Sequence, residues 1–230
     1  MKDLSPLEKK LGVSFRHTDA LKQALVHRSY INENPGFTLD HNERLEFLGD
    51  AVLELIVTEY LYQHYPNPEG DLTNWRASLV NSNMLAKLAE RLGLGPYLYL
   101  SKGEAKDTNG KARHYILANA FEAVVGALYI DQGFEATKTF ILATVIPELP
   151  DILSNHLYLD PKSRFQELAQ EKLKITPTYK VLKEAGPDHN KKFQIGVYLD
   201  TELVATSLGS SKQEGQLKAA ARALKKKEWQ

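Results

Sequence analysis

The chain has 230 residues, in which 29 lysines and arginines balance 29 aspartates and glutamates, so the formal net charge is zero. A hydrophobic fraction of 43% is enough for a packed core and excludes wholesale disorder. The absence of cysteine excludes a disulfide framework, a thiolate nucleophile and cysteine-ligated zinc, and it fits a reducing, cytoplasmic location.

The zero net charge hides two parts of opposite sign. Residues 1–157 contain 15 basic and 20 acidic side chains, a net charge of −5, whereas residues 158–230 contain 14 basic and 9 acidic side chains, a net charge of +5. The longest apolar stretch, residues 51–57, is interrupted by Glu54, so we expect neither a membrane span nor a membrane partner. The charge split indicates two domains with different partners.

Residues 1–150 are predicted to form an all-α domain. Apolar side chains recur every three or four residues, as is typical of amphipathic helices, in four segments: 45–61, 71–92, 114–129 and 134–146. Breaks rich in Gly, Pro, Asn or charged residues separate them at 34–36, 66–70, 93–96 and in a polar loop, 102–111.

A linker is expected at 151–159, after prolines 147 and 150 end the last helix. A small α+β domain is expected at 160–230, opening with an N-cap at Asp160 and with Pro161 in the first turn. Its predicted elements are a helix at 161–173, strands at 178–182, 193–199 and 202–208, and a helix at 211–227. The order α-β-β-β-α predicts a three-stranded antiparallel sheet with both helices on one face.

The most informative stretch is residues 41–50, His-Asn-Glu-Arg-Leu-Glu-Phe-Leu-Gly-Asp. At 100° per residue, Glu43, Glu46 and Asp50 lie within about 60° of one another on a helix. Three carboxylates on one face repel each other unless a cation lies between them. A solvated acidic face is the simpler interpretation, but Gly49 costs about 1 kcal/mol relative to Ala unless another segment approaches closely.

A second candidate segment surrounds Glu122. Asn119 and Glu122 are three residues apart and share one face of the most apolar predicted helix. A glutamate among Ala, Phe and Val is usually paired, ligating or catalytic. Oxygen ligands without Cys or a plausible His pair favour Mg²⁺ or Mn²⁺, which suit water activation and phosphoryl chemistry. The acidic surface and the metal site both stay open as interpretations at this point.

The stretch from Asn42 to Asp50 resembles the signature of the bacterial ribonuclease III family over its whole length. Further similar segments follow in chain order: 69–71, 76–80, 94–95, 116–118, 121–123 and 126–129. The α-β-β-β-α tail resembles a double-stranded RNA-binding domain. The resemblance implies a divalent-metal-dependent endoribonuclease. Such an enzyme cuts double-stranded RNA to 5′-phosphate and 3′-hydroxyl ends in RNA processing, including that of rRNA and mRNA precursors.

The resemblance also implies roles for individual residues. The ligands of Mg²⁺, or of Mn²⁺ as a substitute, would be Glu46, Asp50, Asn119 and Glu122, with Asp50 and Glu122 at the centre of catalysis. Glu43 and Glu69 would assist with a second cation or with the scissile phosphate. Because the family acts as a homodimer, Phe47 would insert into the partner subunit, and the alternative is an ordinary core phenylalanine.

Position 119 departs from the family, which usually has aspartate there. The carbonyl oxygen of Asn119 can still coordinate a cation, but the substitution removes one negative charge and weakens binding. Three hypotheses compete: a natural variant that tolerates Asn, a chain engineered to bind substrate without cutting it, and drift to a binding role. We favour the ribonuclease, because Glu46, Asp50 and Glu122 are all present.

The tail contains the candidate RNA contacts. Gln166 and Gln170, four residues apart on one helix face, can bond 2′-hydroxyls and base edges. His189, in the expected loop at 186–189, matches the family's minor-groove loop. Ser211 and Lys212 open the last helix, whose free N–H groups and dipole favour phosphate.

The match is thinner beyond Lys212. Gln213 stands where the family often has another cation, and Gly215 where it usually has alanine. Fewer cations predict weaker binding with a shallower salt dependence. The lysines at 225–227 either offset this loss or form an ordinary solvated helix end.

Three functions are therefore in competition. The leading hypothesis is the metal-dependent endoribonuclease. The alternative is a non-catalytic double-stranded RNA-binding protein with a decayed nuclease domain, and Asn119 is the residue that separates the two. An unrelated helical dimer with acidic grooves would require the match to the signature to be a coincidence.

Overall fold

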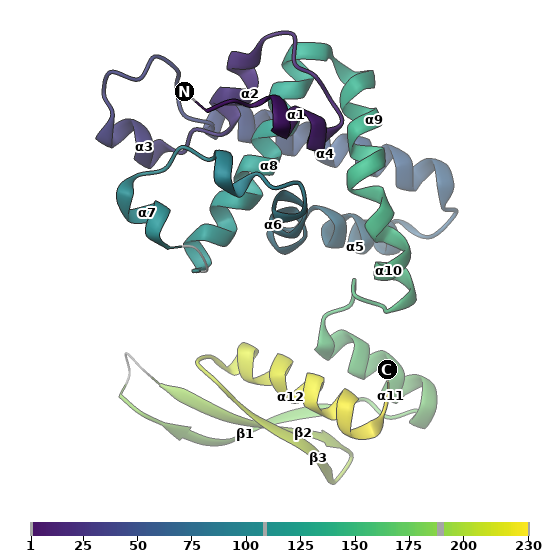
Figure 1. The fold of residues 1–230 in the computed structure, drawn as a ribbon. Helices are drawn as coiled ribbons and strands as arrows, with labels where there is room; N and C mark the ends of the chain where they lie inside the picture. Colours follow the sequence, from purple (N-terminus) through teal and green to yellow (C-terminus); the bar gives the residue numbers. More distant parts are fainter. Residues whose placement is uncertain (1, 108–109, 188–190, 230) are drawn as a thin grey trace. The chain divides into compact units, whose positions relative to one another are not determined.

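In the computed structural model the chain forms helices followed by an α-β-β-β-α arrangement (Figure 1). The structure describes residues 2–107, 110–187 and 191–229. The chain divides into two compact units, Met1–Leu153 and Ser154–Gln230, here called the helical unit and the α/β unit. Within the described residues, no helix is both long and apolar enough to cross a membrane. The predicted fold class is confirmed.

The helical unit is built around one long apolar helix. Its elements are α1 (Ser5–Leu11), α2 (Thr18–Ala24), α3 (Arg28–Glu33), α4 (Glu43–His64), α5 (Glu69–Val80), α6 (Ser82–Arg91), α7 (Lys102–Lys106), α8 (Lys111–Gln132), α9 (Phe134–Thr144), α10 (Leu149–Ser154) and 3-10 turns at Gly95–Tyr97 and Ile146–Glu148. The helix α8 packs against α2, α4, α6 and α9, and its Phe121, Val124 and Leu128 are completely buried. Such all-round burial explains why this segment is the most apolar of the predicted helices.

Two expectations for this unit were wrong. The single helix expected at 71–92 is divided into α5 and α6 at Asn81, where the backbone is extended. The side-chain oxygen of Asn81 caps α6 by accepting a hydrogen bond from the Met84 N–H at 3.0 Å. The polar loop expected at 102–111 contains α7, which Ser101 caps by accepting from Glu104 N–H. The first residues of the linker predicted at 151–159 belong to α10, which ends at Ser154 and tolerates Pro150 in its first turn.

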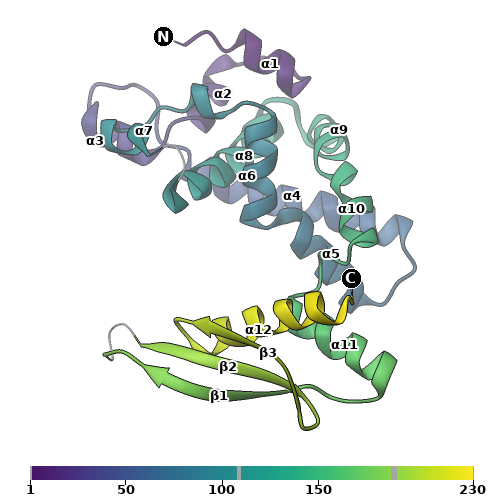
Figure 2. The same cartoon turned by 60° about the horizontal axis from the view of Figure 1, so that its bottom comes forward.

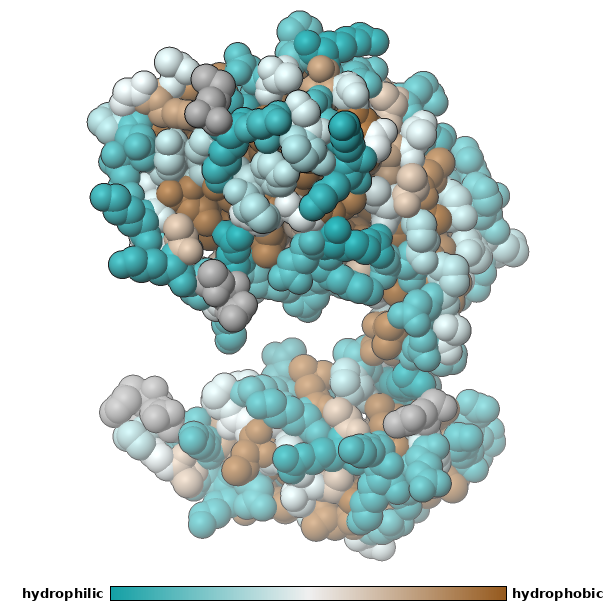
Figure 3. Space-filling view, in the orientation of Figure 1, coloured by the Kyte–Doolittle hydropathy of each residue, from teal (hydrophilic) through white to brown (hydrophobic). Residues whose placement is uncertain are grey.

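The α/β unit contains α11 (Pro161–Leu173), β1 (Thr178–Ala185), β2 (Lys192–Leu199), β3 (Glu202–Gly209) and α12 (Lys212–Lys227). The antiparallel sheet has the order β1-β2-β3, and both helices cover one of its faces (Figure 2). The core joins Phe165 of α11, Ile195 and Val197 of β2, Val204 of β3 and Ala220 of α12. In both units hydrophilic residues dominate the face drawn in Figure 3, with apolar residues visible between them.

The capping and turn residues predicted in this unit adopt the expected conformations. The Asp160 side chain caps α11 by accepting from the N–H groups of Lys162 and Ser163, and Asp200, in the tight turn between β2 and β3, has a left-handed φ of 50°. The strand β1 runs three residues beyond the predicted end at Leu182. A bulge between Val181 and Lys183 shifts the register there and interrupts the alternation that would have marked the remainder as strand.

The glycine at position 215 has a packing reason. A Cβ atom there would lie 2.4 Å from Cγ1 of Ile195 on β2, a distance that side chains cannot adopt. The Gly215 carbonyl also accepts a 2.6 Å hydrogen bond from the buried Ser207 hydroxyl. The helix α12 is therefore closer to the sheet at this point than an alanine would permit.

We expect Gly215→Ala to destabilise the α/β unit, although alanine is the better helix former by about 1 kcal/mol. Overpacking costs typically about 1–3 kcal/mol, so the thermal unfolding midpoint should fall by several degrees. Circular dichroism of the full chain measures this, with the exposed Gln213→Ala in the same helix as the control. An unchanged or raised midpoint for Gly215→Ala would contradict the close approach.

Candidate functional site

The helices α4 and α8 touch backbone to backbone. A Cβ atom at Gly49 would lie 1.8 Å from the Glu122 carbonyl oxygen and 2.8 Å from the Gly126 nitrogen. A Cβ atom at Gly126 would lie 2.2 Å from the Leu45 carbonyl oxygen. Packed helices are normally about 8–10 Å apart at their axes, and only glycine on both sides permits a closer crossing. The close approach expected at Gly49 is confirmed, and its partner is the helix that carries Glu122.

The start of α4 is held in place by Asn42, which sequence analysis treated only as part of the signature. This side chain is buried, and its amide donates to the Ala24 carbonyl at 3.2 Å, while its backbone N–H donates to the Val26 carbonyl at 2.9 Å. Both acceptors lie at or just after the end of α2. Two bonds from one residue thus fix where α4 begins, and with it the orientation of its acidic face.

The crossing brings three carboxylates into electrostatic contact. Burial raises the pKa of Glu122 to about 8, with further contributions from the negative charges of Asp50 and Glu46. Burial also raises the pKa of Glu46, and the neighbouring charges of Glu43 and Asp50 act in the same direction. The cluster therefore contains more negative charge than its surroundings compensate, as expected of groups placed for chemistry rather than stability.

Asn119, one turn before Glu122 on α8, interacts with the same group of carboxylates. Its half-buried side chain hydrogen-bonds to Glu46, which partly opposes the rise in the Glu46 pKa. A carboxamide can donate to a carboxylate, whereas an ionised aspartate at this position could only repel it. Asn119 thus stabilises the metal-free cluster by a bond that the family's usual residue would not make.

The other two predicted acids lie apart from this cluster centre. Glu43, in the first turn of α4, is exposed and forms an ion pair with Arg28 at 3.4 Å. Glu69, in the first turn of α5, accepts a 3.0 Å hydrogen bond from the Thr73 hydroxyl and lines a pocket of about 670 Å³ with Tyr62 and Arg76. No interaction observed among the described residues joins Glu69 to Glu46, Asp50 or Glu122.

The cluster offers oxygen donors suited to a hard divalent cation, namely the carboxylates of Glu46, Asp50 and Glu122 and the carbonyl of Asn119. Among the residues that the structure describes, no three His, Asp or Glu side chains converge into a preformed metal cage. The raised pKa values of Glu46 and Glu122 fit a cation, because a positive ion would relieve the repulsion that causes part of them.

Phe47, beside these acids, does not belong to the core. Its side chain is 82% exposed, so the alternative of an ordinary core phenylalanine is wrong for this chain. Leu55 and Tyr62, eight and fifteen residues further along α4, are 58% and 79% exposed. These three exposed apolar residues lie on one side of α4 and are here called the α4 stripe.

The predicted RNA contacts of the α/β unit lie on exposed helix positions. Gln166 and Gln170 are exposed on α11, whereas Phe165 and Ala169 of the same helix are buried. Ser211 caps α12 by accepting from Glu214 N–H at 3.1 Å, and Lys212 follows in the first turn. His189 lies outside the described residues.

Comparison with protein families agrees with this architecture. Residues 18–149 match the family model described as Ribonuclease-III-like, and residues 161–227 match the double-stranded RNA binding motif. The first match covers most of the helical unit with α4 and α8, and the second covers α11 to α12. The chain belongs to the ribonuclease III family of double-stranded RNA-specific endoribonucleases, and its α/β unit is a double-stranded RNA-binding domain.

Individual relatives are similar over nearly the whole chain. Ribonuclease 3 of Nitratiruptor sp. is 45% identical over 226 residues, which is 98% of this chain and 97% of the relative. Ribonuclease 3 of Oceanobacillus iheyensis is 44% identical over 223 residues, 96% of this chain and 97% of the relative. A solved ribonuclease III nuclease domain from Campylobacter jejuni is 40% identical, with a TM-score of 0.57 over 64% of this chain and 99% of that domain.

We expect Gly49→Ala to separate α4 from α8, because its methyl group would overlap the Glu122 carbonyl. The shift should cost about 3 kcal/mol or more and remove tight Mn²⁺ binding. Calorimetric unfolding and Mn²⁺ titration measure the two effects. Gly70→Ala is the matched control, since Gly70 lies in α5 with open space around its Cα. Equal behaviour of the two variants would contradict the role given to the crossing.

We expect Glu122→Gln to stabilise the metal-free protein, and only at higher pH. Because the folded pKa of Glu122, about 8, is above its unfolded value, folding takes up a proton between roughly pH 4 and pH 8, and stability falls as the pH rises through that range. In EDTA at pH 8.5 the variant should unfold about 2–6 °C higher than the parent, and at pH 4 the midpoints should coincide. A gain that is the same at both pH values would contradict the raised pKa.

Proposed function

We propose that Glu46, Asp50, Asn119 and Glu122 hold Mg²⁺, or Mn²⁺ in its place, and that this chain cuts double-stranded RNA there to 5′-phosphate and 3′-hydroxyl ends. The observation that carries the proposal is the Gly49–Gly126 crossing, which brings the half-buried Glu122 of α8 beside two acids of α4. Membership of the ribonuclease III family supports the substrate class.

The bound cation would supply a Lewis acid that lowers the pKa of water and neutralises charge on the scissile phosphate. The chain itself orients that chemistry. Glu46 and Asp50, one turn apart on α4, present oxygens from one side, and Glu122 of α8 presents its carboxylate from the other. Glu43, paired with Arg28 at 3.4 Å, is close enough to Glu46 for its charge to raise the pKa of that group, and it would be a further acid able to hold a second cation.

Asn119 reduces the negative charge of this site by one relative to an aspartate. A ligand set with three carboxylates and one carbonyl still suits Mg²⁺, although at lower affinity. We therefore favour an active enzyme with a raised metal requirement over a binding-only protein. The use of rRNA and mRNA precursors as substrates and a cytoplasmic location are part of the same proposal.

The functional unit is proposed to be a homodimer formed through the α4 stripe. Phe47 projects from the helical unit, and the same unit contains the apolar pocket between α4 and α5 that Tyr62, Tyr65 and Leu72 line. In a two-fold dimer each copy offers the same knob and the same pocket, so both contacts form at once. At about 670 Å³, the pocket is large enough for a phenyl ring. The homologous Campylobacter jejuni domain also has a region involved in dimer formation.

This dimer would give Glu69 a role that its position within one chain does not explain. Glu69 lines the pocket that would receive Phe47, and Phe47 is next to Glu46 in the sequence. Insertion of the knob would therefore bring Glu69 of the partner subunit close to the carboxylate cluster. Each catalytic site would then contain acids from both chains.

Cleavage of labelled duplex RNA tests the enzyme. We expect the parent chain to cut with Mg²⁺, Asn119→Asp to need about tenfold less Mg²⁺ because one ligand charge returns, and Glu122→Gln to lose at least about a hundredfold in rate. If the parent chain only shifts the RNA on a gel while Asn119→Asp cuts it, the binding-only alternative is correct. Persistent cleavage by Glu122→Gln would instead refute the assignment of the site.

The dimer has a separate test. We expect Phe47→Glu to give monomers by light scattering, because a carboxylate buried in the partner's pocket costs several kcal/mol. Cleavage should also be lost, because a monomer's site lacks the Glu69 that the partner subunit would contribute. The exposed Leu157→Glu, in the α/β unit, is the control that adds the same charge elsewhere. An unchanged mass for Phe47→Glu would exclude Phe47 as the knob.

A further inference from the structure

Within the double-stranded RNA-binding domain, one carboxylate joins two lysines. Glu184, near the end of β1, lies 3.4 Å from Nζ of Lys212 and 3.5 Å from Nζ of Lys191. Lys212 is the first residue of α12, and Lys191 immediately precedes β2. One acid thus bridges the start of the helix expected to bind phosphate and the strand that follows the β1–β2 loop.

The surroundings hold this bridge at one end of the sheet. Glu184 is opposite Phe193 in the β1–β2 ladder, and the Lys212 ammonium lies 5.6 Å from the centre of the Phe193 ring. The side chains of Glu184 and Lys212 are 37% and 59% exposed, so solvent and ligands reach both of them. An RNA phosphate that approaches Lys212 therefore meets the carboxylate of Glu184 within a few ångströms.

We propose that Glu184 competes with nucleic-acid phosphates for Lys191 and Lys212. This inference rests on the RNA contacts predicted for the α/β unit. The competition lowers the affinity for every polyanion whose phosphates reach these two lysines.

The physical argument concerns the balance of two effects. Exposed ion pairs such as these are worth little, so the loss of the bridge gives up little ordering of the lysines. A carboxylate close to an incoming phosphate repels it, and a lysine already paired with a carboxylate releases fewer counterions on binding. Removal of the Glu184 charge should therefore strengthen binding and steepen its salt dependence.

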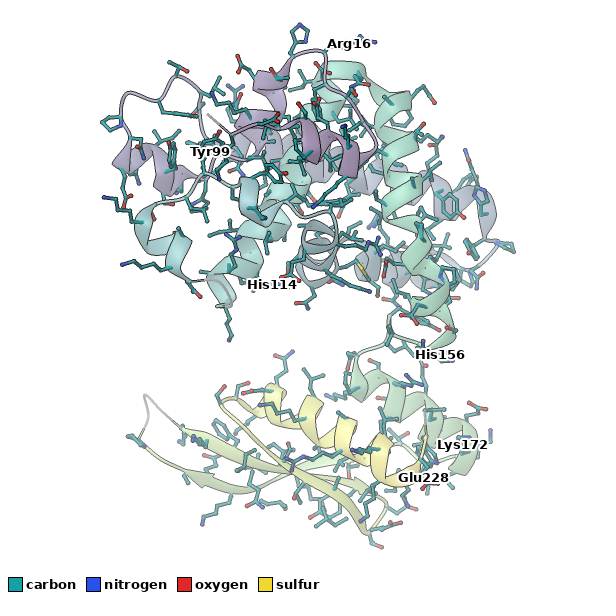
Figure 4. All side chains as sticks on the ribbon, in the orientation of Figure 1. Arg16, Tyr99, His114, His156, Lys172 and Glu228 are labelled. Carbon is teal, nitrogen blue, oxygen red and sulfur yellow. The ribbon has the colours of Figure 1, made fainter. Side chains whose placement is uncertain are left out.

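The test compares Glu184→Gln with Glu202→Gln in the full chain. Lys172 and Glu228 mark the ends of α11 and α12 at one end of the α/β unit (Figure 4), and there Glu202 forms a 3.0 Å ion pair with Lys227. Glu202, at the start of β3, lies in the same sheet as Glu184 but at its opposite end. The two variants change net charge equally, so a difference between them reports position rather than overall charge.

Binding of duplex RNA and of duplex DNA of the same length is measured by fluorescence anisotropy with Ca²⁺ and without Mg²⁺, from about 50 to 250 mM salt. We expect Glu184→Gln to bind both duplexes about threefold more tightly, with a log–log salt slope steeper by about one. Glu202→Gln should change either affinity less than twofold. Unchanged or weaker binding by Glu184→Gln, or an equal gain for both variants, would overturn the inference.

Lys212→Gln distinguishes the inference from the proposal on which it rests. If Lys212→Gln leaves RNA binding unchanged, the assignment of the RNA-contact surface is wrong. If Lys212→Gln weakens binding while Glu184→Gln has no effect, only the competition by Glu184 is wrong. When both are correct, Glu184→Gln gives a smaller gain in the Lys212→Gln background, because one of its two lysines is absent.

Discussion

The crossing of α4 and α8 is the constraint on which the rest of the helical unit depends. Gly49 and Gly126 let the two backbones meet where any side chain would overlap a carbonyl oxygen or a peptide nitrogen. This contact decides that Glu122, on an otherwise apolar helix, lies beside the acids of α4. Without it the same residues would form two separate acidic surfaces with no shared chemistry.

The clustered carboxylates lower the stability of the folded chain, and apolar packing elsewhere on α8 offsets this loss. Burial and like charges raise the pKa of Glu122 to about 8, which means that its ionised form is unfavourable in the folded chain. The buried apolar face of α8 supplies the compensating free energy, with residues such as Phe121 and Val124 completely excluded from solvent. Asn119 softens the repulsion by bonding Glu46.

The two units divide the work of handling a polyanion. In the proposed function, the helical unit, at −5, would accept a phosphodiester where cations cover its carboxylates, and the RNA-binding domain, at +5, would attract it. In the proposed competition, Glu184, which pairs with Lys191 and Lys212, would moderate that attraction. Acidic and basic groups thus offset each other both between the two units and, at Glu184, within one surface of the α/β unit.

Periodicity and capping residues in the sequence determined the fold class, the longer helices and the acidic face formed by Glu43, Glu46 and Asp50, whereas the short helices α1, α2 and α3 were not predicted. Elements that depend on one local side chain, such as the Asn81 break and the Ser101 cap of α7, were missed because a single polar residue hardly alters an apolar period. Only the tertiary structure decided which helix meets Gly49, why position 215 excludes a side chain, and which lysines Glu184 holds. Each of these is a contact between residues far apart in the chain, and a backbone approach of this kind is set by packing rather than by local pattern.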